Sequence, residues 1–223
     1  MYRTSKNTQE RKDAKRQLIL DMAAKVFAIK GYHNTAVKDI VDEASVSVGS
    51  FYFYFKSKED LFTELYMSIA KNSQEKTMGV LDIENYSLVK NFTRVMMVNL
   101  WLYEQNRDIS KIMLLEAATV NPEFQKARSE SIRESAQTMA TWFGRFKAHN
   151  SVNIPDERVA ALIYEGSFYY LINDWLESDE SVHLTDCGYA FCVYNLQALK
   201  ISFKEESIKQ YIDEVLKELE ESH

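Results

Sequence analysis

The chain has 223 residues and a net charge of −6, and 46% of its residues are hydrophobic, with only six Gly and two Pro. This length allows one small and one larger domain, and so few Gly and Pro argue against a β architecture, so we expect an all-α protein. No apolar run of about twenty residues occurs and the N-terminus is polar, so we expect neither a membrane span nor a secretory signal, and a cytoplasmic location.

Charge divides the chain unevenly. Residues 1–58 hold eleven Lys and Arg against six Asp and Glu, a net charge of +5, whereas residues 59–223 carry −11. A basic head on an acidic body is expected of a protein whose head alone binds nucleic acid. By itself the basic end is weak evidence, because residues 1–10 read equally well as a solvated tail.

Two short helices separated by a tight turn are predicted between residues 35 and 58. Thr35 is placed to cap the first helix, over 37–44. Ser45 and Val46 form the turn, and Ser47 can cap a second helix that ends near Phe55. Such a pair places its second helix in the major groove of DNA.

The helical period divides the second helix into two faces. Phe51 and Phe55, four residues apart, are expected to face inward, which turns Val48, Gly49, Ser50, Tyr52 and Phe53 outward. The alternative is a plain three-helix bundle in which Tyr52, Phe53 and Tyr54 are packed core residues. A helix this short cannot bury all of them, and an outward aromatic ring can contact a thymine methyl group or offer a hydroxyl to phosphate.

These features resemble the TetR family of bacterial transcriptional regulators, over about residues 12–72. The resemblance rests on Gly31-Tyr32, on the helix pair, and on the stretch from Tyr52 to Lys58, which reads YFYFKSK. The chain departs from the family at Ser45, where Gly is usual, so we expect strain in the turn. It also departs at Val48, often Lys, so its operator cannot be copied from a relative.

The resemblance implies an N-terminal three-helix helix-turn-helix DNA-binding domain, followed by a larger helical ligand-binding and dimerisation domain. We assign the first to 1–57, with the helix-turn-helix at about 36–55, and the second to 58–223. Ser57 caps a connecting helix over 58–78, at whose start Lys58 would stand near the DNA backbone. The expected contacts to double-stranded operator DNA are Thr35, Lys38, Ser47, Val48, Gly49, Ser50, Tyr52, Phe53, Tyr54 and Lys58.

The body shows helical patterns at about 86–105, 108–119, 122–150, 155–177, 185–203 and 205–221. The segments 155–177 and 185–203 are apolar on more than one face, which predicts burial against a second copy in a homodimer. The alternative is that both are central helices of a monomer. The last helix has one apolar stripe, which could pack on its own chain or across a dimer, and we favour its own chain.

Residues that could line a cavity for a small apolar or amphipathic ligand are Phe92, Met96, Trp101, Met113, Glu116, Trp142, Phe143, Glu165, Phe168 and Tyr169. Met and aromatic residues at helical spacing are more often plain core. Glu116 and Glu165 fall among apolar neighbours, where an unpaired buried carboxylate is costly. Each can equally face solvent or pair with Arg or Lys.

The sequence thus favours a homodimeric repressor that a ligand releases from its operator, with release itself implied by the resemblance. The alternative from another class is a dimeric helical adaptor without operator recognition. An enzyme is poorly supported, because no Gly-rich phosphate loop, HExxH motif or nucleophile motif is present. The two cysteines, Cys187 and Cys192, lack metal-ligand spacing, so we predict no metal site and no cofactor.

Overall fold

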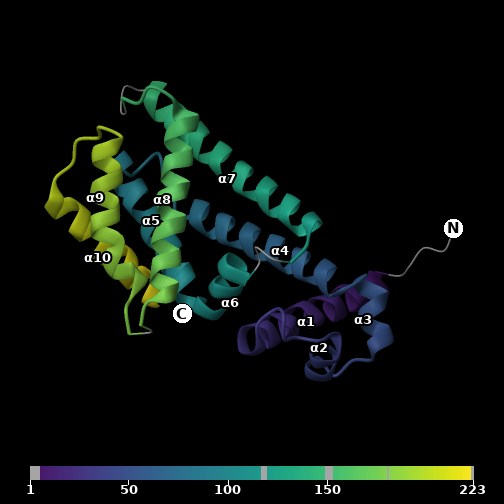
Figure 1. The fold of residues 1–223 in the computed structure, drawn as a ribbon. Helices are drawn as coiled ribbons and strands as arrows, with labels where there is room; N and C mark the ends of the chain where they lie inside the picture. The colour runs from purple at the N-terminus through teal and green to yellow at the C-terminus, as the bar shows by residue number, and fades with distance from the viewer. Residues whose placement is uncertain (1–5, 117–119, 149–152, 180, 222–223) are drawn as a thin grey trace. The chain divides into compact units, whose positions relative to one another are not determined.

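The computed structural model describes residues 6–116, 120–148, 153–179 and 181–221, which form helices joined by short loops (Figure 1). No strand occurs within these ranges, so the all-α prediction is confirmed. None of the described helices is both long and apolar enough to cross a membrane.

The chain forms two compact units. The first contains residues 1–69 and 108–128, and the second contains 70–107 and 129–223. The first unit therefore includes residues 58–69 and 108–128, which the sequence analysis assigned to the second domain. One helix, α4 (Lys58–Gly79), begins in the first unit and ends in the second, and it matches the connecting helix predicted over 58–78.

Three helices open the first unit: α1 (Lys6–Lys30), α2 (Val37–Glu43) and α3 (Val48–Tyr54). Their apolar faces meet the start of α4 in one core. Phe27 and Phe62 pack edge to face with ring centroids 5.4 Å apart, and Phe124 lies 5.2 Å from Phe62. Phe124 comes from the start of α7 (Pro122–Ala148), so a segment distant in sequence completes the core of the N-terminal helices.

The turn between α2 and α3 has the backbone pattern of a Schellman helix end. The Ser45 N–H donates to the Asp42 carbonyl (3.2 Å), and the Val46 N–H donates to the Val41 carbonyl (3.0 Å). Ser45 has φ 51°, in the left-handed region that favours glycine. The left-handed φ at Ser45 is the backbone conformation from which strain at this turn is expected, and the strain itself stays a prediction.

One predicted helix of the body divides into two elements. The sequence pattern predicted a single helix over 108–119, but α6 (Arg107–Lys111) gives way to a π-helical turn (Ile112–Glu116). Ile112 and Met113 are buried in the core of the first unit, and the wider turn accompanies this packing. Residues 117–119 lie outside the described ranges.

The second unit contains α5 (Leu88–Gln105), most of α7, α8 (Glu157–Glu177), a 3₁₀ turn (Leu184–Cys187), α9 (Gly188–Ala198) and α10 (Glu205–Glu221). As predicted, α7 begins at Pro122. By contrast, α8 begins two residues after Pro155, because the Asp156 carboxylate caps it by accepting from the Val159 N–H (2.9 Å).

The end of α9 lies earlier than the predicted residue 203. Lys200 takes φ 55°, and the Ile201 N–H donates to the Leu196 carbonyl (2.9 Å), which closes a second Schellman turn. Leu196 and Ile201, which stand at the two positions that usually make an apolar contact in this turn, are both buried. The apolar residues after 198 thus belong to a helix end and not to a longer helix.

The last helix packs on its own chain, as the sequence pattern favoured. Ile208 and Val215 of α10 are buried. The guanidinium of Arg94 on α5 donates to both carboxylate oxygens of Glu218 (3.0 and 2.7 Å), and the Lys90 ammonium lies 2.8 Å from Glu214. Apolar contact and paired charges together hold α10 against α5.

Candidate nucleic-acid interface

The outward face of α3 is apolar and aromatic. Phe51 and Phe55 are buried as predicted, whereas Val48 is 48%, Tyr52 56% and Phe53 65% exposed. Val48 and Tyr52 are one helical turn apart and therefore share a face. The alternative in which these aromatic residues are all packed core is thus wrong for Tyr52 and Phe53.

Ser47 fixes where α3 begins. Its Oγ accepts a hydrogen bond from the Ser50 N–H (3.1 Å), which is the cap predicted from the sequence. The same hydroxyl donates to the Ser50 Oγ (3.3 Å), so the two serines bond to one another. Gly49 is exposed beside them.

One basic side chain borders this face, and two more are exposed on neighbouring segments. The Lys12 ammonium lies 5.5 Å from the centre of the Phe53 ring, at cation–π distance, and Tyr54, half-buried, packs edge to face on Phe53 at 4.9 Å. Lys38 on α2 and Lys56 after α3 are exposed. An apolar strip with positive charge beside it is complementary to a groove lined by phosphates.

Thr35 does not cap α2, so that prediction was wrong. Its side chain is 2% exposed, and its hydroxyl donates to the Gly31 carbonyl (2.7 Å). The N-cap is Ala36, whose N–H donates to the Asp39 carboxylate (2.8 Å). Thr35 therefore stabilises the loop before α2, and its hydroxyl is turned away from solvent.

Lys58 points into the protein. Its ammonium donates to the carbonyls of Tyr32 and Thr35, each at 2.8 Å, and lies 4.3 Å from the centre of the Tyr32 ring. Burial lowers the pKa of the Lys58 ammonium. Two of its three donors thus hold the loop before α2 against the start of α4, a role that the sequence pattern did not reveal.

Tyr32 completes this polar group. Its hydroxyl donates to the Glu59 carboxylate (3.1 Å), and burial, together with the neighbouring Glu59 charge, raises the pKa of the phenol well above its usual value. Capping of α4 is as predicted, since the Asp60 N–H donates to the Ser57 hydroxyl (3.2 Å). The Gly-Tyr pair noted in the sequence therefore positions the helix pair through Tyr32.

Part of the predicted ligand set forms one aromatic cluster in the second unit. Tyr164 lies at its centre, with ring centroids 6.3 Å from Phe92, 6.5 Å from Phe143 and 6.2 Å from Phe168. The buried Tyr164 hydroxyl donates to the Met96 sulfur (2.8 Å). Tyr164 was not among the predicted residues, and a thioether is a weak acceptor for so deeply buried a hydroxyl.

Glu165 joins α8 to α7. Its carboxylate accepts from the Ser135 hydroxyl (2.7 Å), and burial raises the pKa of the carboxyl group. One carboxylate oxygen of Glu165 is thus hydrogen-bonded within the chain. The sequence left open whether Glu165 faces solvent or pairs with Arg or Lys, and its observed partner is instead a serine.

The remaining predicted ligand residues lie elsewhere. Met113 is buried in the core of the first unit, and the Glu116 side chain is outside the described part of the structure. Trp142 is half-buried, and its ring packs at a tilt on Phe146 of the same helix, with centroids 5.6 Å apart. Trp101 is buried on α5, and Tyr169 is half-buried beside Tyr170.

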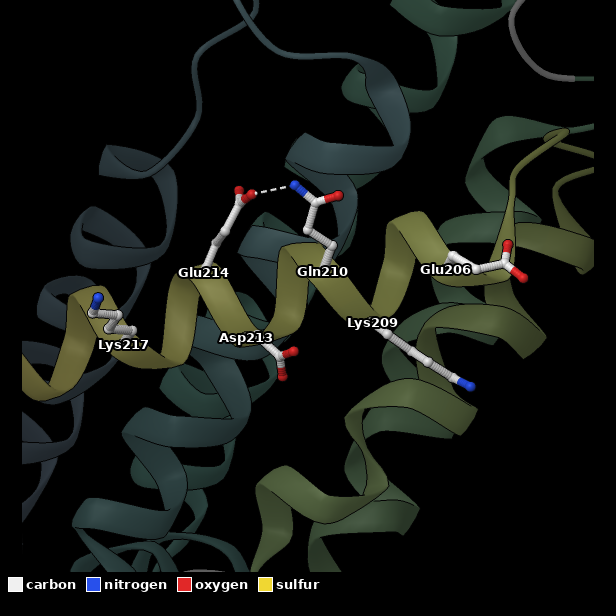
Figure 2. A pocket seen from close by; sticks show the side chains of 6 residues that line it. All are labelled: Glu206, Lys209, Gln210, Asp213, Glu214 and Lys217. Carbon is white, nitrogen blue, oxygen red and sulfur yellow. Dashed lines mark hydrogen bonds between the residues drawn. The ribbon is translucent and has the colours of Figure 1, made fainter.

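An open hollow of about 530 Å³ lies on α10, and none of its lining residues belongs to the aromatic cluster. Figure 2 shows that its lining comes from one helix face: Glu206, Lys209, Gln210, Asp213, Glu214 and Lys217. Charges of both signs lie there, and the Gln210 amide donates to the Glu214 carboxylate (2.8 Å). This is the solvated face of α10 and not an apolar ligand site.

A second surface exposes apolar residues. Along α8, one stripe of outward residues contains Val159, Leu162, Ile163 and Tyr170, and Tyr194 is exposed on α9. The two helices pack together, with the rings of Phe168 and Phe191 5.7 Å apart. These are the segments predicted to meet a second copy.

Metal-binding and reactive groups are not indicated in the part of the chain that the structure describes. No group of three or more His, Cys, Asp or Glu side chains there could hold a metal ion. Cys192 is buried, and this burial raises the pKa of its thiol to about 12, so it is an unreactive core residue.

Comparison with known proteins identifies the family of the N-terminal helices. The family model described as bacterial regulatory proteins, tetR family, matches residues 19–65, which contain α2, α3 and the start of α4. The chain carries a TetR-family N-terminal domain. The resemblance seen in the sequence is confirmed, and proteins of this family are regulators, in agreement with the prediction that the chain is not an enzyme.

Curated relatives match the chain mainly over the same region. It is 38% identical over 82 residues to YuxN, an uncharacterized HTH-type transcriptional regulator of Bacillus subtilis, which covers 37% of the chain and 22% of YuxN. It is 32% identical over 80 residues to the HTH-type transcriptional regulator AcrR of Shigella flexneri, covering 36% and 35%. The chain spans less than two thirds of the length of these relatives.

Solved structures share the fold over most of the chain. The fatty acid degradation regulator FadR from Bacillus halodurans superposes with a TM-score of 0.75 at 20% identity, over 84% of this chain and 97% of that one. FadR from Bacillus subtilis, solved with stearoyl-CoA, gives 0.72 at 22% identity, over 80% and 96%. The predicted TetR-like architecture is therefore confirmed as a fold.

Proposed function

We propose that this protein is a DNA-binding transcriptional regulator that reads operator DNA with α3. The observation that carries the proposal is the exposed face of Val48, Tyr52 and Phe53, held outward by buried Phe51 and Phe55. A soluble helix gains nothing by exposing three large apolar side chains unless a partner covers them. Lys12 beside Phe53, the exposed Lys38 and Lys56 of the same unit, and the family match favour duplex DNA as that partner.

The contact set proposed for DNA is narrower than the sequence implied. Lys38, Ser47, Val48, Gly49, Ser50, Tyr52, Phe53 and Tyr54 remain in it. Thr35 and Lys58 act through the loop that they stabilise, since their polar groups bond to backbone carbonyls.

A homodimer is the second part of the proposal. The stripe on α8 is continuous over three turns, and Gly166 lies within it where an added Cβ would meet nothing within 4 Å. A second copy covering this stripe and Tyr194 buries apolar surface and presents two α3 helices to one duplex. Operator half-sites would then be spaced by about 34–36 Å or a multiple of it.

The third part is release from DNA by a small, largely apolar ligand in the second unit. The cluster around Tyr164 supplies the apolar wall, and its hydroxyl, bonded only to sulfur among the contacts described, is a donor that a ligand could engage. The stearoyl-CoA bound by one FadR makes acyl-CoA the first compound class to screen. A ligand shifts the equilibrium between the DNA-binding and non-binding geometries of the dimer only if it binds the non-binding geometry more tightly than the DNA-binding one.

Two connections can transmit that shift to the head. One is α4, which continues from the first unit into the second. The other is the segment 108–128, whose Ile112, Met113 and Phe124 belong to the core of the head. Movement of either would alter how α3 is presented.

The test is selection of genomic DNA fragments by the purified wild-type protein and by Tyr52→Ala, with Ile29→Ala as control. Ile29 is exposed on α1, outside α3, so its loss should leave selection unchanged. We expect wild type and Ile29→Ala to enrich the same sequence equally and Tyr52→Ala to enrich it far less. No enrichment by a folded wild-type dimer would contradict the regulator and favour the adaptor.

A further inference from the structure

The composition of α3 excludes the usual hydrogen-bonding side chains for reading bases. Its seven residues, VGSFYFY, contain no Arg, Lys, Asn, Gln, Asp or Glu. Arg and Lys read guanine and Asn and Gln read adenine by paired hydrogen bonds in the major groove. Ser50, the short polar residue of α3, is half-buried and already bonds Ser47 through both its N–H and its hydroxyl.

The outward groups of α3 are instead suited to apolar contact. Val48 and Tyr52 form an exposed pair one turn apart, next to Gly49, which adds no side chain that would hold the helix away from a base. The floor of the major groove presents one apolar group, the 5-methyl of thymine. Phe53 lies beside the Lys12 ammonium, so it borders the phosphate side of this surface.

Resting on the proposed DNA-binding function, we propose that thymine 5-methyl groups set the sequence specificity of α3, through contact with Val48 and Tyr52. The occupant is duplex DNA because positive charge borders the face and residues 1–58 carry +5. Lysine contacts to phosphate then supply affinity, whereas methyl contacts supply the preference among sequences.

The experiment separates the methyl group from the hydrogen-bonding groups of the base. At each thymine of the most enriched fragment, the wild-type protein is titrated on four duplexes carrying thymine, uracil, 5-methylcytosine or cytosine, each with its complementary purine. If the protein recognises methyl groups, its affinity for the thymine duplex and for the 5-methylcytosine duplex should be the same at one or more positions per half-site. Uracil and cytosine should bind about fourfold more weakly there for each methyl group lost.

Variants assign the effect to α3. Val48→Ala should reduce the ratio of thymine-duplex to uracil-duplex affinity towards one at one position, because the two γ-methyl groups of Val48 are removed. Tyr52→Phe should keep the ratio, since it retains the ring, and Ile29→Ala should change nothing. Circular dichroism and the oligomeric state confirm that each variant is folded.

The outcomes distinguish the two proposals. If thymine and uracil bind alike at every position while cytosine and 5-methylcytosine bind weakly, hydrogen bonds are read and methyl readout is overturned, although the protein remains a regulator. If a ratio persists in Val48→Ala at every position, Val48 has no part in it. If no fragment is enriched at all, the proposed function itself fails.

Discussion

Two surfaces of this molecule expose large apolar side chains, the face of α3 and the stripe of α8, yet their surroundings differ. The α3 face lies beside Lys12, and exposed Lys38 and Lys56 come from the same unit. The α8 helix carries Glu157, Glu165, Asp174 and Glu177 against one arginine. An exposed apolar surface indicates a binding partner, and the charge around that surface indicates whether the partner is a nucleic acid or a protein.

The comparison teaches that neither surface can substitute for the other. A polyanion is repelled by the acidic surroundings of α8 and attracted to the basic border of α3. A protein partner such as a second copy can cover the α8 stripe, because it is not a polyanion. The stripe is also longer than the two turns of α3. Changes on one surface should therefore leave the function of the other intact, unless dimerisation is needed for DNA affinity.

The largest effect is expected from Ile163→Lys, which places a charge in the middle of the α8 stripe. An unpaired ammonium buried at an interface costs several kcal/mol, so the dimer dissociation constant should rise by about 100-fold or more. Sedimentation velocity over a concentration series measures it. Ile83→Lys, a change of the same kind at an exposed residue outside α8, should leave the dimer intact; equal dissociation of both variants would remove α8 from the interface.

A smaller effect is expected from Tyr52→Ala on α3. Removing an aromatic side chain that becomes buried on DNA should lower operator affinity by roughly 10- to 100-fold, and the dimer should remain. Fluorescence anisotropy and sedimentation measure the two properties in parallel. Loss of dimerisation in this variant would mean that the two surfaces are not independent.

Backbone strain at the α2–α3 turn gives a stability prediction. Ser45→Gly should stabilise the fold by about 1 kcal/mol, because glycine adopts a left-handed conformation without the steric cost that serine has. Ser45→Ala keeps that cost and should not stabilise. Chemical denaturation compares them, with Lys200→Gly as the matching change at the end of α9; a less stable Ser45→Gly would show that the turn is not strained.

The smallest effect concerns Glu165 and pH. Burial raises the pKa of this carboxyl group in the folded protein, so folding favours its protonated form, and its contribution to stability is lost as pH rises through the folded pKa. Glu165→Gln should therefore be modestly more stable than wild type at pH 7, and the difference should vanish in acid. Thermal melts from pH 4 to 8 test this, and a pH-independent difference would contradict it.

The sequence predicted the head better than the body. Burial of Phe51 and Phe55 follows from helical spacing, and the left-handed Ser45 follows from a serine at a glycine position. The inward roles of Thr35 and Lys58 were missed, because their acceptors are backbone carbonyls of a loop, which leave no trace in a residue pattern.

After residue 58, contacts between residues distant in sequence determine which side chains pack together, and helical periodicity does not reveal these contacts. Met113 has the spacing of a cavity residue, but its segment folds into the core of the first unit. Tyr164 was overlooked among many aromatic residues of α8, although it is the ring around which the others gather. The end of α9 depends on Lys200 adopting a conformation that its identity does not favour.

The most direct test of the central claim is the anisotropy of the wild-type protein on its most enriched fragment and on a scrambled duplex, at about 50 and 200 mM salt. If the α3 face reads DNA, the selected fragment should bind at nanomolar concentration and far more tightly than the scrambled one, and both should weaken as salt rises. Equal affinity for the two duplexes at both salt concentrations, from a folded dimer, would contradict it.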